Sequence, residues 1–504
     1  MGGETSMYLG IDLGTSSVKV IVVDEQGVII DSATSKYPIS YPKPLWSEQN
    51  PEDWWQGTKE AIKRIVDKNQ GLGDKIKGIS FSGQMHGLVL LDQNGEVLRP
   101  AILWNDGRTQ KQCDYLNNVI GRDKLSQYTG NIALSGFTGP KVMWVKENEP
   151  EVFNKIAHIL LPKDYIRYKL TGDYKIDVAD ASGTLFFDVK NKVWSKEMLD
   201  ILDIQPSWLP EVYECYEVTG VVEKEVAKQL GLNEDVKVVG GGGDQAVGAV
   251  GTGTVSDGIV SVSLGTSGVV FAASDKYEVD QKNRLHSFNH ANGAFTQMGV
   301  MLSAAYCLQW WAEEVNKDID SDKVYQILTK EASKVPAGSE GLIFLPYLTG
   351  ERTPHADVNA TGVFIGLKPI HTRGHMTRAI LEGVSYGLRD SLEIVKDMQI
   401  PINEIRITGG GIRNELWAKI LASVFNQELH IVEASEGPAY GAAILAMVGC
   451  GLFPSVEAAC NKLIKVSKTV KSSDDEAKIY DKYYSVFKKG YAQLKNMYQE
   501  LSML

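Results

Sequence analysis

Two stretches of this chain share one layout: YLGIDLGTSSVKVIVVD (Tyr8–Asp24) and GIVSVSLGTSGVVFAAS (Gly258–Ser274). Each contains a β-branched run, a Leu-Gly-Thr-Ser tetrapeptide and a second β-rich run, which is the pattern of two strands joined by a tight turn. Leu13–Ser16 and Leu264–Ser267 are identical although half the chain separates them. Four common residues recur easily by chance, but the matching apolar flanks favour an internal duplication.

Length and composition narrow the class of protein. The chain has 504 residues, 43% hydrophobic and 23% charged, which is typical of a soluble globular protein of two large domains. A net charge of −11 argues against non-specific binding to nucleic acid or anionic membranes. No apolar run is long enough to span a bilayer, and Met1–Ser6 does not resemble a signal peptide. Five cysteines without a C-x-x-C motif fit a reducing compartment. We therefore expect a cytoplasmic protein with no nucleic-acid or membrane partner.

Helices and strands alternate along both halves, which predicts an α/β fold. Asn50, followed by Pro51 and two acids, predicts the start of a helix. We place the two domains at about 7–246 and 247–504, with a tight hinge near Asp244–Gly253. A last helix over 475–504 should dock on the body through apolar residues at i+3 and i+4 spacing. These residues are Ile479, Tyr483, Phe487, Tyr491, Leu494, Tyr498 and Leu501.

Glycine and small hydroxylated residues in the two repeated turns suggest a phosphate site. Such turns let backbone N–H groups and hydroxyls converge on phosphate oxygens. One copy alone is more simply an ordinary hairpin turn, whereas two copies in equivalent places favour a polyphosphate held from both sides. The residues concerned are Gly14, Thr15, Ser16, Gly265, Thr266 and Ser267.

A third glycine-rich element lies in INEIRITGGGIRNELWAKILASVF (402–425), which predicts a strand, a glycine triplet and a helix capped by Asn414. Gly409, Gly410 and Gly411 would let a flat nucleoside lie against the backbone. An ordinary strand-to-helix loop explains the triplet equally well.

Two aspartates are candidates for chemistry beside these turns. Asp244 follows four glycines in VVGGGGDQAVGAV (Val238–Val250), and it is either a helix cap or a general base that accepts a hydroxyl proton during phosphoryl transfer. Asp12 precedes the first turn, where a carboxylate either holds Mg²⁺ through water or closes an Asx turn. Lys19 lies on the second strand of this hairpin. The sequence favours neither of two positions for its side chain, one facing phosphate and one facing solvent.

The same glycine run fits the dinucleotide pattern G-x-G-x-x-A, which raises a nicotinamide enzyme as an alternative. The segment after it, AVGAVGTGTVSDG, is too rich in glycine for the long helix which that pattern requires. The alternative also leaves the duplicated turns unexplained, so we disfavour it.

A loop that interrupts two apolar strands contains Gln84, Met85 and His86. Histidine can donate to or accept from a polyol hydroxyl, and methionine offers a soft apolar wall. The alternative, a buried histidine satisfied by backbone, is slightly less favoured because a Met-His pair inside a loop is uncommon for packing alone. Trp104 ends another strand and offers an apolar face for the C–H surface of a sugar. Asp106 and Arg108, next in the chain, form either part of that site or a loop-stabilising ion pair.

As a set and in order, these motifs resemble the FGGY family of carbohydrate kinases, whose ATPase scaffold is shared with actin, Hsp70 and hexokinase. GFTGPKVMWVKEN (Gly136–Asn148) resembles one family signature, and PYLTGERTPH and TGGGIRNELWAKILA resemble others. The resemblance covers about Tyr8 to Gly451. It implies two ribonuclease-H-like domains around a central cleft, with sugar mainly on the first domain and ATP mainly on the second.

The resemblance also implies the activity. GQMHG and ILWNDGRT are similar to the members that phosphorylate a ketopentose, D-xylulose, at its terminal 5-hydroxyl with ATP and Mg²⁺. Asp244 is then the proton acceptor, Gln84, Met85, His86 and Trp104 are substrate residues, and Asp12 lies near metal and γ-phosphate. The two Gly-Thr-Ser turns match the phosphate motifs, and Gly409, Gly410, Gly411 and Asn414 match the adenosine motif.

Three alternatives stay open at this point. The first is this ketopentose kinase, and the second is a kinase of the same family that acts on ribulose, gluconate or glycerol. The third is an actin-like protein that switches on nucleotide binding without transfer chemistry, against which the presence of both Asp12 and Asp244 argues. Homodimers are common in the family, but the sequence shows no interface.

Overall fold

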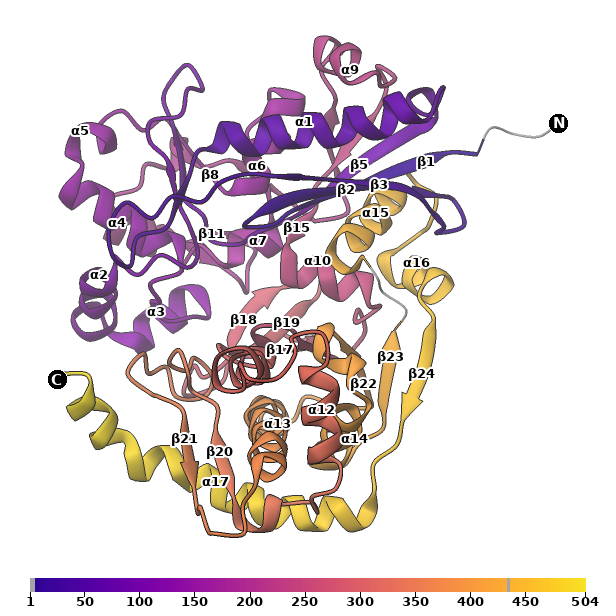
Figure 1. Ribbon diagram of the computed structural model, residues 1–504. Coiled ribbons are helices and arrows are strands. Elements are labelled where there is room, and N and C mark those ends of the chain that lie inside the picture. The colour runs from indigo at the N-terminus through magenta and orange to yellow at the C-terminus, as the bar shows by residue number, and fades with distance from the viewer. Residues whose placement is uncertain (1–4, 433–435) are drawn as a thin grey trace.

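The computed structural model describes residues 5–432 and 436–504, which build two mixed β-sheets, one in the upper and one in the lower half of Figure 1. The first sheet contains β1 (Met7–Leu13), β2 (Ser17–Asp24), β3 (Ile29–Lys36), β5 (Ile76–Gly83), β13 (Val218–Val221), β14 (Lys237–Val239) and β15 (Gly242–Gly243). The second contains β16 (Ile259–Leu264), β17 (Gly268–Ser274), β18 (His286–Asn289), β19 (Phe295–Met301), β22 (Glu404–Thr408), β23 (Leu429–Val432) and β24 (Val466–Val470).

The two sheets have the same topology. The strand order is β3-β2-β1-β5-β14-β13 in the first sheet and β19-β17-β16-β22-β23-β24 in the second, with β18 added at one edge. In each, the first two strands form the antiparallel hairpin that the sequence repeat predicts. The first strand of each hairpin then pairs in parallel with a strand from later in the chain. The internal duplication and the two-domain α/β fold are therefore confirmed.

Helices surround the sheets and fill the connections between their strands. They are α1 (Pro51–Lys68), α2 (Gln110–Tyr115), α3 (Arg122–Thr129), α4 (Thr138–Asn148), α5 (Pro150–Phe153), α6 (Pro162–Thr171), α7 (Val178–Ser182), α8 (Lys196–Leu202), α9 (Lys224–Leu230), α10 (Asp244–Gly251), α11 (Ala305–Trp310), α12 (Val324–Ala332), α13 (Arg373–Asp397), α14 (Glu415–Phe425), α15 (Gly437–Gly449), α16 (Val456–Leu463) and α17 (Asp474–Leu501). The start of α1 is as predicted, because the Asn50 side chain accepts a hydrogen bond from the backbone N–H of Glu52.

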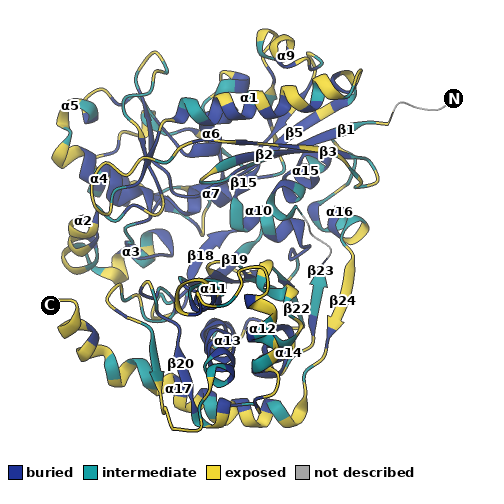
Figure 2. Ribbon diagram, viewed as in Figure 1, coloured by how far each residue is buried: buried dark blue, intermediate teal, exposed yellow. Residues whose placement is uncertain are grey.

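Strand β2 shows how the first sheet is buried on both faces. Val18, Val20 and Val22 point toward a core that includes Trp54 of α1, whereas Ile21 and Val23 point toward α15. Because both faces are covered, β2 is apolar at consecutive positions rather than at alternate ones. In Figure 2 the strands of both sheets are mostly buried, and β24 is exposed.

Glycines bring α10 and α15 into close contact where the two halves meet. A Cβ atom at Gly441 of α15 would overlap the carbonyl oxygen of Val247, and one at Gly251 of α10 would overlap that of Gly437. Gly10 on β1 is packed in the same way against Ala439. The segment expected to be the hinge is therefore largely the short helix α10, which is held backbone to backbone against α15.

The C-terminal helix packs on the body, but the predicted face is partly wrong. Ile479 and Leu501 are 38% and 53% exposed, whereas Tyr480 and Tyr484 are buried. The tyrosines can be buried because their hydroxyls have partners: Tyr480 accepts from the Arg378 guanidinium, and Tyr484 donates to Asp390. Apolar spacing alone does not reveal such partners.

Replacing Gly441 tests the close contact of α10 and α15. Alanine normally favours a helix over glycine by about 1 kcal/mol, yet we expect Gly441→Ala to destabilise the protein by roughly 2 kcal/mol or more, because the new methyl group displaces the α10 backbone. Thermal or denaturant unfolding measures the change.

Gly437→Ala is the matched control in the same helix, since a Cβ atom there meets no described atom within 4 Å. We expect this variant to be as stable as the parent. Equal stability of the two variants would contradict the proposed packing constraint.

Candidate active site

The two aspartates singled out in the sequence lie at one edge of the first sheet. Strands β1, β5 and β15 run in parallel, with Asp12 of β1 opposite Ser82 of β5 and Ser82 opposite Gly242 of β15. Asp12 accepts a hydrogen bond from the Ser82 hydroxyl at 2.9 Å. Asp244 follows β15 directly as the first residue of α10. The carboxyl ends of these strands therefore bring both aspartates to the same place.

The four glycines before Asp244 form a β-bulge. Val238 lies opposite Ile79 of β5 and Gly242 opposite Ser82, so β14 and β15 together contain one residue more than their partner strand. Gly241 adopts a φ of +74°, and a Cβ atom there would overlap the Phe81 backbone. A bulge of this kind redirects the strand that comes after it. The glycines therefore aim Asp244, and Gly243 rather than Asp244 stands at the N-cap of α10.

Both carboxyl groups have raised pKa values. Burial is the main cause for Asp244, followed by repulsion from Asp12, and together they raise its pKa to about 7. Burial raises the pKa of Asp12 to about 6, against the hydrogen bond from Ser82 and the attraction of Lys19. A carboxyl group with a pKa near 7 is well matched to accepting a proton at neutral pH.

The first Gly-Thr-Ser turn has its carbonyl oxygens tied back into the protein. The Tyr37 hydroxyl donates to Gly14 O at 2.6 Å, the Gln49 amide donates to Thr15 O at 2.6 Å, and the Tyr37 backbone N–H donates to Ser16 O at 3.2 Å. Among the described residues, no hydrogen bond engages the backbone N–H of Thr15 or Ser16. The turn therefore keeps donors free and acceptors occupied, as an anion site requires.

The carbonyl oxygens of the second turn are also occupied, but by different donors. The backbone N–H groups of Ala304 and Ala305 donate to Thr266 O and Gly265 O at 2.9 and 2.8 Å, and Gly265 N–H donates to Ser267 O at 3.1 Å. Within residues 5–432 and 436–504, no partner takes the N–H of Thr266 or Ser267. The duplicated turns thus share an electrostatic character as well as a sequence.

A cavity of about 1150 Å³ adjoins the second turn. The strand register explains its position: Ser263 of β16 lies opposite Thr408 of β22, so the Gly265 turn and the glycine triplet leave the sheet side by side. Gly409, at φ +99°, lies so close to Leu264 that a side chain would clash. The cavity is lined by Leu264, Gly265, Thr266, Ala305, Leu308, Gln309, Tyr325, Gln326, Thr329, Lys330, Ser333, Gly410, Gly411, Arg413, Asn414, Glu415, Leu416 and Trp417.

Asn414 supports this cavity by fixing its walls. Its side-chain oxygen accepts from the Trp417 N–H and caps α14, as predicted, while its amide donates to the Thr329 hydroxyl of α12 at 2.9 Å. Both ends of the side chain are therefore engaged in joining two helices. Ser267 and Gly409 are not among the residues that line the cavity.

His86 lies beyond the edge of the first sheet with one ring nitrogen fixed. Its Nδ1 lies 2.8 Å from the carbonyl oxygen of Gly183, so Nδ1 carries the proton and donates. Burial and the charge of Lys141 lower the pKa of His86, which is therefore neutral at pH 7. Nε2 is then an acceptor, and no described residue donates to it. Such a nitrogen can accept a hydrogen bond from a sugar hydroxyl.

The neighbours of His86 in the predicted loop have different surroundings. Met85 packs against Gly243, directly before Asp244. Gln84 is turned inward, where its amide donates to Gln49 at 3.0 Å and its carbonyl oxygen has no partner among the described residues. The backbone N–H of Gln84 donates to Leu13 O and ties the loop to the end of β1.

Lys141 holds the His86 loop in place, and sequence reasoning missed it. Its buried ammonium donates to His86 O and to Gly136 O, both at 2.8 Å, and the Thr138 hydroxyl donates to His86 O at 3.1 Å. His86 itself has a φ of +66°, a left-handed conformation that histidine adopts only when its surroundings enforce it. Lys141 lies within GFTGPKVMWVKEN, the stretch that resembles a family signature. The motif therefore contained this residue, but it did not show that the residue holds the His86 loop.

Trp104 lies beside the first Gly-Thr-Ser turn, whereas its neighbours Asp106 and Arg108 pair with each other. The Trp104 ring is 40% exposed, and its N–H donates to the Thr15 hydroxyl at 3.0 Å, beside the first turn. Asp106 forms the loop-stabilising ion pair that the sequence left open: it binds Arg108 through both oxygens and accepts from the Ser47 N–H.

Lys19 takes neither of the two positions expected from the sequence. It lies opposite Asp12 in the β1–β2 hairpin and forms an ion pair with Glu436, which precedes α15. The pair joins the hairpin of the first sheet to the segment that packs behind it.

A buried network of charges lies behind the glycine bulge, and no sequence motif indicated it. Lys163 of α6 contacts three carboxylates, those of Asp164 at 2.5 Å, Asp177 and Asp180. Arg167, one turn later, pairs with Asp164 at 3.0 Å and donates to the carbonyl oxygen of Gly240 in the bulge. The five side chains are fully buried. They fix the shape of the strand that aims Asp244.

Neither a metal cluster nor a membrane span occurs in the described part of the chain. No group of three or more His, Cys, Asp and Glu side chains among these residues is arranged to hold a metal ion. No helix within residues 5–432 and 436–504 is both long and apolar enough to cross a membrane.

Comparison with known proteins identifies the class to which this fold and site belong. Residues 7–251 match the N-terminal domain of the FGGY family of carbohydrate kinases, and residues 260–450 match its C-terminal domain. The chain therefore belongs to the FGGY family of carbohydrate kinases, and the resemblance seen in its motifs is confirmed.

Individual relatives show which carbohydrate kinases the chain is similar to. The chain is 40% identical to a xylulose kinase of Bacillus subtilis, with 97% of each chain covered, and 44% identical to a xylulose kinase of Escherichia coli, with 88% and 90% covered. Among solved structures, a gluconate kinase from Lactobacillus acidophilus superposes with a TM-score of 0.94 at 27% identity, over 99% of this chain and 100% of that one.

Removing one cation tests the buried network behind the bulge. We expect Lys163→Met to destabilise the protein by about 3–5 kcal/mol, because it leaves buried carboxylates without their partner. Lys169→Met in the same helix α6 is the matched control, since Lys169 forms only a half-exposed pair with Glu52 at 3.4 Å; its effect should stay within about 0.5 kcal/mol. Equal unfolding midpoints for both variants would show that the network does not support the fold.

Proposed function

We propose that this protein transfers the γ-phosphoryl group of ATP to the 5-hydroxyl of D-xylulose, in the cytoplasm. The observation that carries the proposal is the meeting of Asp12, the His86 loop and Asp244 at one edge of the first sheet. The relatives named xylulose kinase, which align over nearly the whole chain, support the choice of sugar.

The second half of the chain supplies the nucleotide site in this proposal. The cavity of about 1150 Å³ is large enough for an adenosine group, and Gly410 and Gly411 let the base lie against the backbone. Phosphates leaving this cavity would reach the free N–H groups of the Gly265–Ser267 turn and, from the other sheet, those of the Gly14–Ser16 turn. The sugar then belongs mainly to residues 7–246 and ATP to residues 247–504.

Mg²⁺ fits the donor chemistry beside the first turn. Asp12 offers a carboxylate, the ligand type that this cation prefers, and one such ligand is enough when phosphates and water supply the rest. The raised pKa values of Asp12 and Asp244 reflect burial and repulsion that a cation would relieve. When bound, the ion neutralises negative charge on the transferring phosphoryl group.

The chain's own residues then perform three tasks. Asp244 accepts the proton of the attacking hydroxyl, while the fixed neutral His86 and the apolar Met85 orient the rest of the sugar. The exposed face of Trp104 covers its C–H surface. Closure of the two halves keeps water from competing with the sugar hydroxyl, which it resembles chemically.

The substrate assignment is tested by turnover across a panel of acceptors. ADP release is measured with D-xylulose, L-xylulose, D-ribulose, gluconate and glycerol, and we expect the highest kcat/KM for D-xylulose. Higher turnover of gluconate or glycerol would reject the assignment in favour of another activity in the same family. Absence of acceptor-dependent ADP release would favour a nucleotide-switched protein without transfer chemistry.

Asp244→Asn tests the base and its pH dependence together. We expect kcat to fall by roughly 10²- to 10⁴-fold, with nucleotide affinity unchanged. In the parent enzyme, kcat/KM should rise with pH around a midpoint near 7, because the Asp244 pKa is about 7 and only the ionised form accepts a proton.

The same variant should be more stable than the parent. Because its pKa is raised, Asp244 binds its proton more tightly in the folded protein than in the unfolded chain. The protonated form therefore favours the folded state, and this stabilisation is lost as the pH rises through about 7. Asparagine has no such charge, and we expect Asp244→Asn to raise Tm by roughly 1 to 4 °C at pH 8 and by less at pH 5. If Asp244→Asn keeps normal turnover, Asp244 is not the base and has only a structural role at the start of α10.

A further inference from the structure

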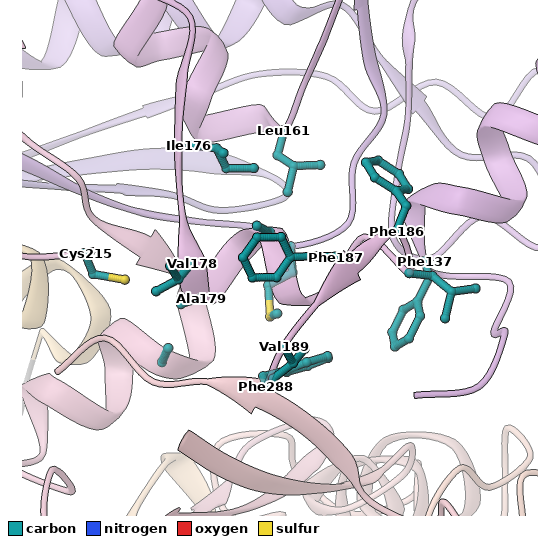
Figure 3. Close-up of a cluster of buried hydrophobic side chains, with 14 of the residues drawn as sticks. Phe137, Leu161, Ile176, Val178, Ala179, Phe186, Phe187, Val189, Cys215 and Phe288 are labelled. Carbon is teal, nitrogen blue, oxygen red and sulfur yellow. The ribbon is translucent and has the colours of Figure 1, made fainter. Parts of the chain in front are cut away.

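Four aromatic rings extend the sugar side of the site into the second half of the chain. The His86 ring lies 4.7 Å from that of Phe137, and Phe137 lies 5.5 Å from His286, which stacks on Phe288 at 5.5 Å. Phe137 and Phe288 belong to the buried cluster drawn in Figure 3, which contains residues from both halves. The surroundings of His86 are therefore completed by β18 of the second sheet.

Arg352 approaches this cluster from the second half on a firmly held loop. Its backbone N–H donates to the Glu351 carboxyl at 2.8 Å, and the next residue, Thr353, exchanges hydrogen bonds of 2.9 and 3.0 Å with Val300 of β19. The end of its side chain lies beside Gly136, since an added Cβ atom there would lie 3.8 Å from an Arg352 guanidinium nitrogen. Gly136 directly precedes Phe137.

Among the described residues, no ion pair and no hydrogen-bond acceptor engages the Arg352 guanidinium, and the residue is partly exposed. Burial lowers its pKa. By contrast Arg284, on the same side, pairs with Asp280 through two hydrogen bonds of 2.9 and 2.7 Å. A guanidinium that is partly shielded from water is commonly paired with an acceptor in the protein. Arg352, beside the rings around His86 and without such a partner among the described residues, has donors to offer to a ligand with acceptor oxygens.

The charge of Arg352 lowers the pKa of both histidines among the four rings. It contributes to lowering the pKa of His86, and after burial it is the cause that lowers the pKa of His286 to about 3. Both rings are therefore neutral. The neighbouring Glu351 does not neutralise the guanidinium, since burial raises its pKa to about 8 and its Oε1 accepts from two backbone N–H groups.

Arg352 and His286 face a cavity of about 210 Å³ that both halves of the chain enclose. Asn131, Ile132 and Leu134 come from the first half, and the arginine, the histidine and residues 354–356 come from the second. The cavity is small, and its lining also includes Arg122, Lys282 and Arg284, of which Arg284 pairs with Asp280. These donors suit a ligand end that carries acceptor oxygens, such as the hydroxyl and carbonyl oxygens of a sugar.

We propose that Arg352 is a substrate-binding and specificity-determining residue that reaches from the second half to the keto end of the sugar. Asp244 takes the terminal hydroxyl, and the opposite end, with its C2 carbonyl and C1 hydroxyl, lies toward His86, Phe137 and the Arg352 guanidinium. The planar guanidinium donates to these two oxygens at once, as its geometry favours. Sugar binding thereby connects the two halves directly. This inference rests on the proposed sugar kinase function.

The test compares Arg352→Gln and Arg352→Lys with the parent enzyme. Glutamine keeps part of the aliphatic stem and removes the charge and the planar fork of donors, so we expect kcat/KM for D-xylulose to fall about 10- to 100-fold, with KM for ATP unchanged. Lysine should recover part of the loss. Calorimetric titration of D-xylulose without nucleotide should show the same fold-change in Kd, which a defect limited to ATP would not produce.

Two controls keep the result specific. Lys276→Gln alters an exposed cation of the second half that does not line this cavity and should leave kcat/KM unchanged. Arg352→Ala should regain activity when guanidinium or ethylguanidinium ions are added, whereas a merely misfolded variant would not. Parent-like kcat/KM in Arg352→Gln, an equal loss in Lys276→Gln, or a loss confined to the KM for ATP would overturn the proposal. If the parent enzyme itself fails to phosphorylate D-xylulose, the proposed function fails first, and the Arg352 variants are then compared on the acceptor that it does use.

Discussion

The one-residue bulge between β14 and β15 is the constraint on which the rest of this site depends. It shifts the strand register so that Asp244 leaves the sheet beside Asp12, in a place where burial raises both pKa values. The bulge requires glycine because its backbone touches β5 directly, and the carbonyl oxygen of the buried Gly240 requires support from a hydrogen-bond donor. Arg167 supplies that support by donating to Gly240 O from within a fully buried network. Backbone conformation, buried charge and the Asp244 carboxyl group are thus parts of one arrangement.

The duplication of the fold gives one chain two equivalent places, at which we propose that two different ligands bind. Each sheet ends its first strand in a Gly-Thr-Ser turn whose carbonyl oxygens are occupied and whose N–H groups are free. The segments beyond the two sheet edges then differ. In the first half the neighbouring strand continues into the His86 loop, and in the second it continues into the glycine triplet that lines the large cavity. The shared turn suits phosphate, and the divergent neighbours suit a sugar on one side and a nucleoside on the other.

Contacts between the halves are of two physical kinds. Behind the site, α15 of the second half packs backbone to backbone against Gly10 of β1, and Lys19 pairs with Glu436. On the sugar side the contact is made by rings and a cavity, with an arginine that has no partner within the described part of the chain. The first kind holds the halves together whether or not ligand is bound. The second leaves the Arg352 guanidinium available to a ligand, and in our proposal sugar bound there links the second half to the first.

The sequence by itself determined the duplicated hairpins, the cap of α1, the strand-glycine-helix unit that ends at Asn414, and the family, because each depends on local pattern within about twenty residues. It also named Asp12, His86 and Asp244 as candidates, but it did not show how the strands bring them to one edge of the sheet. Only the tertiary structure decided that the glycines form a bulge, that Lys141 holds the His86 loop, that Lys163 and its partners are buried, and that Lys19 pairs across to Glu436. It also decided which face of α17 is buried. These features arise from groups far apart in the chain, and their energies depend on burial and on partners that no local pattern contains.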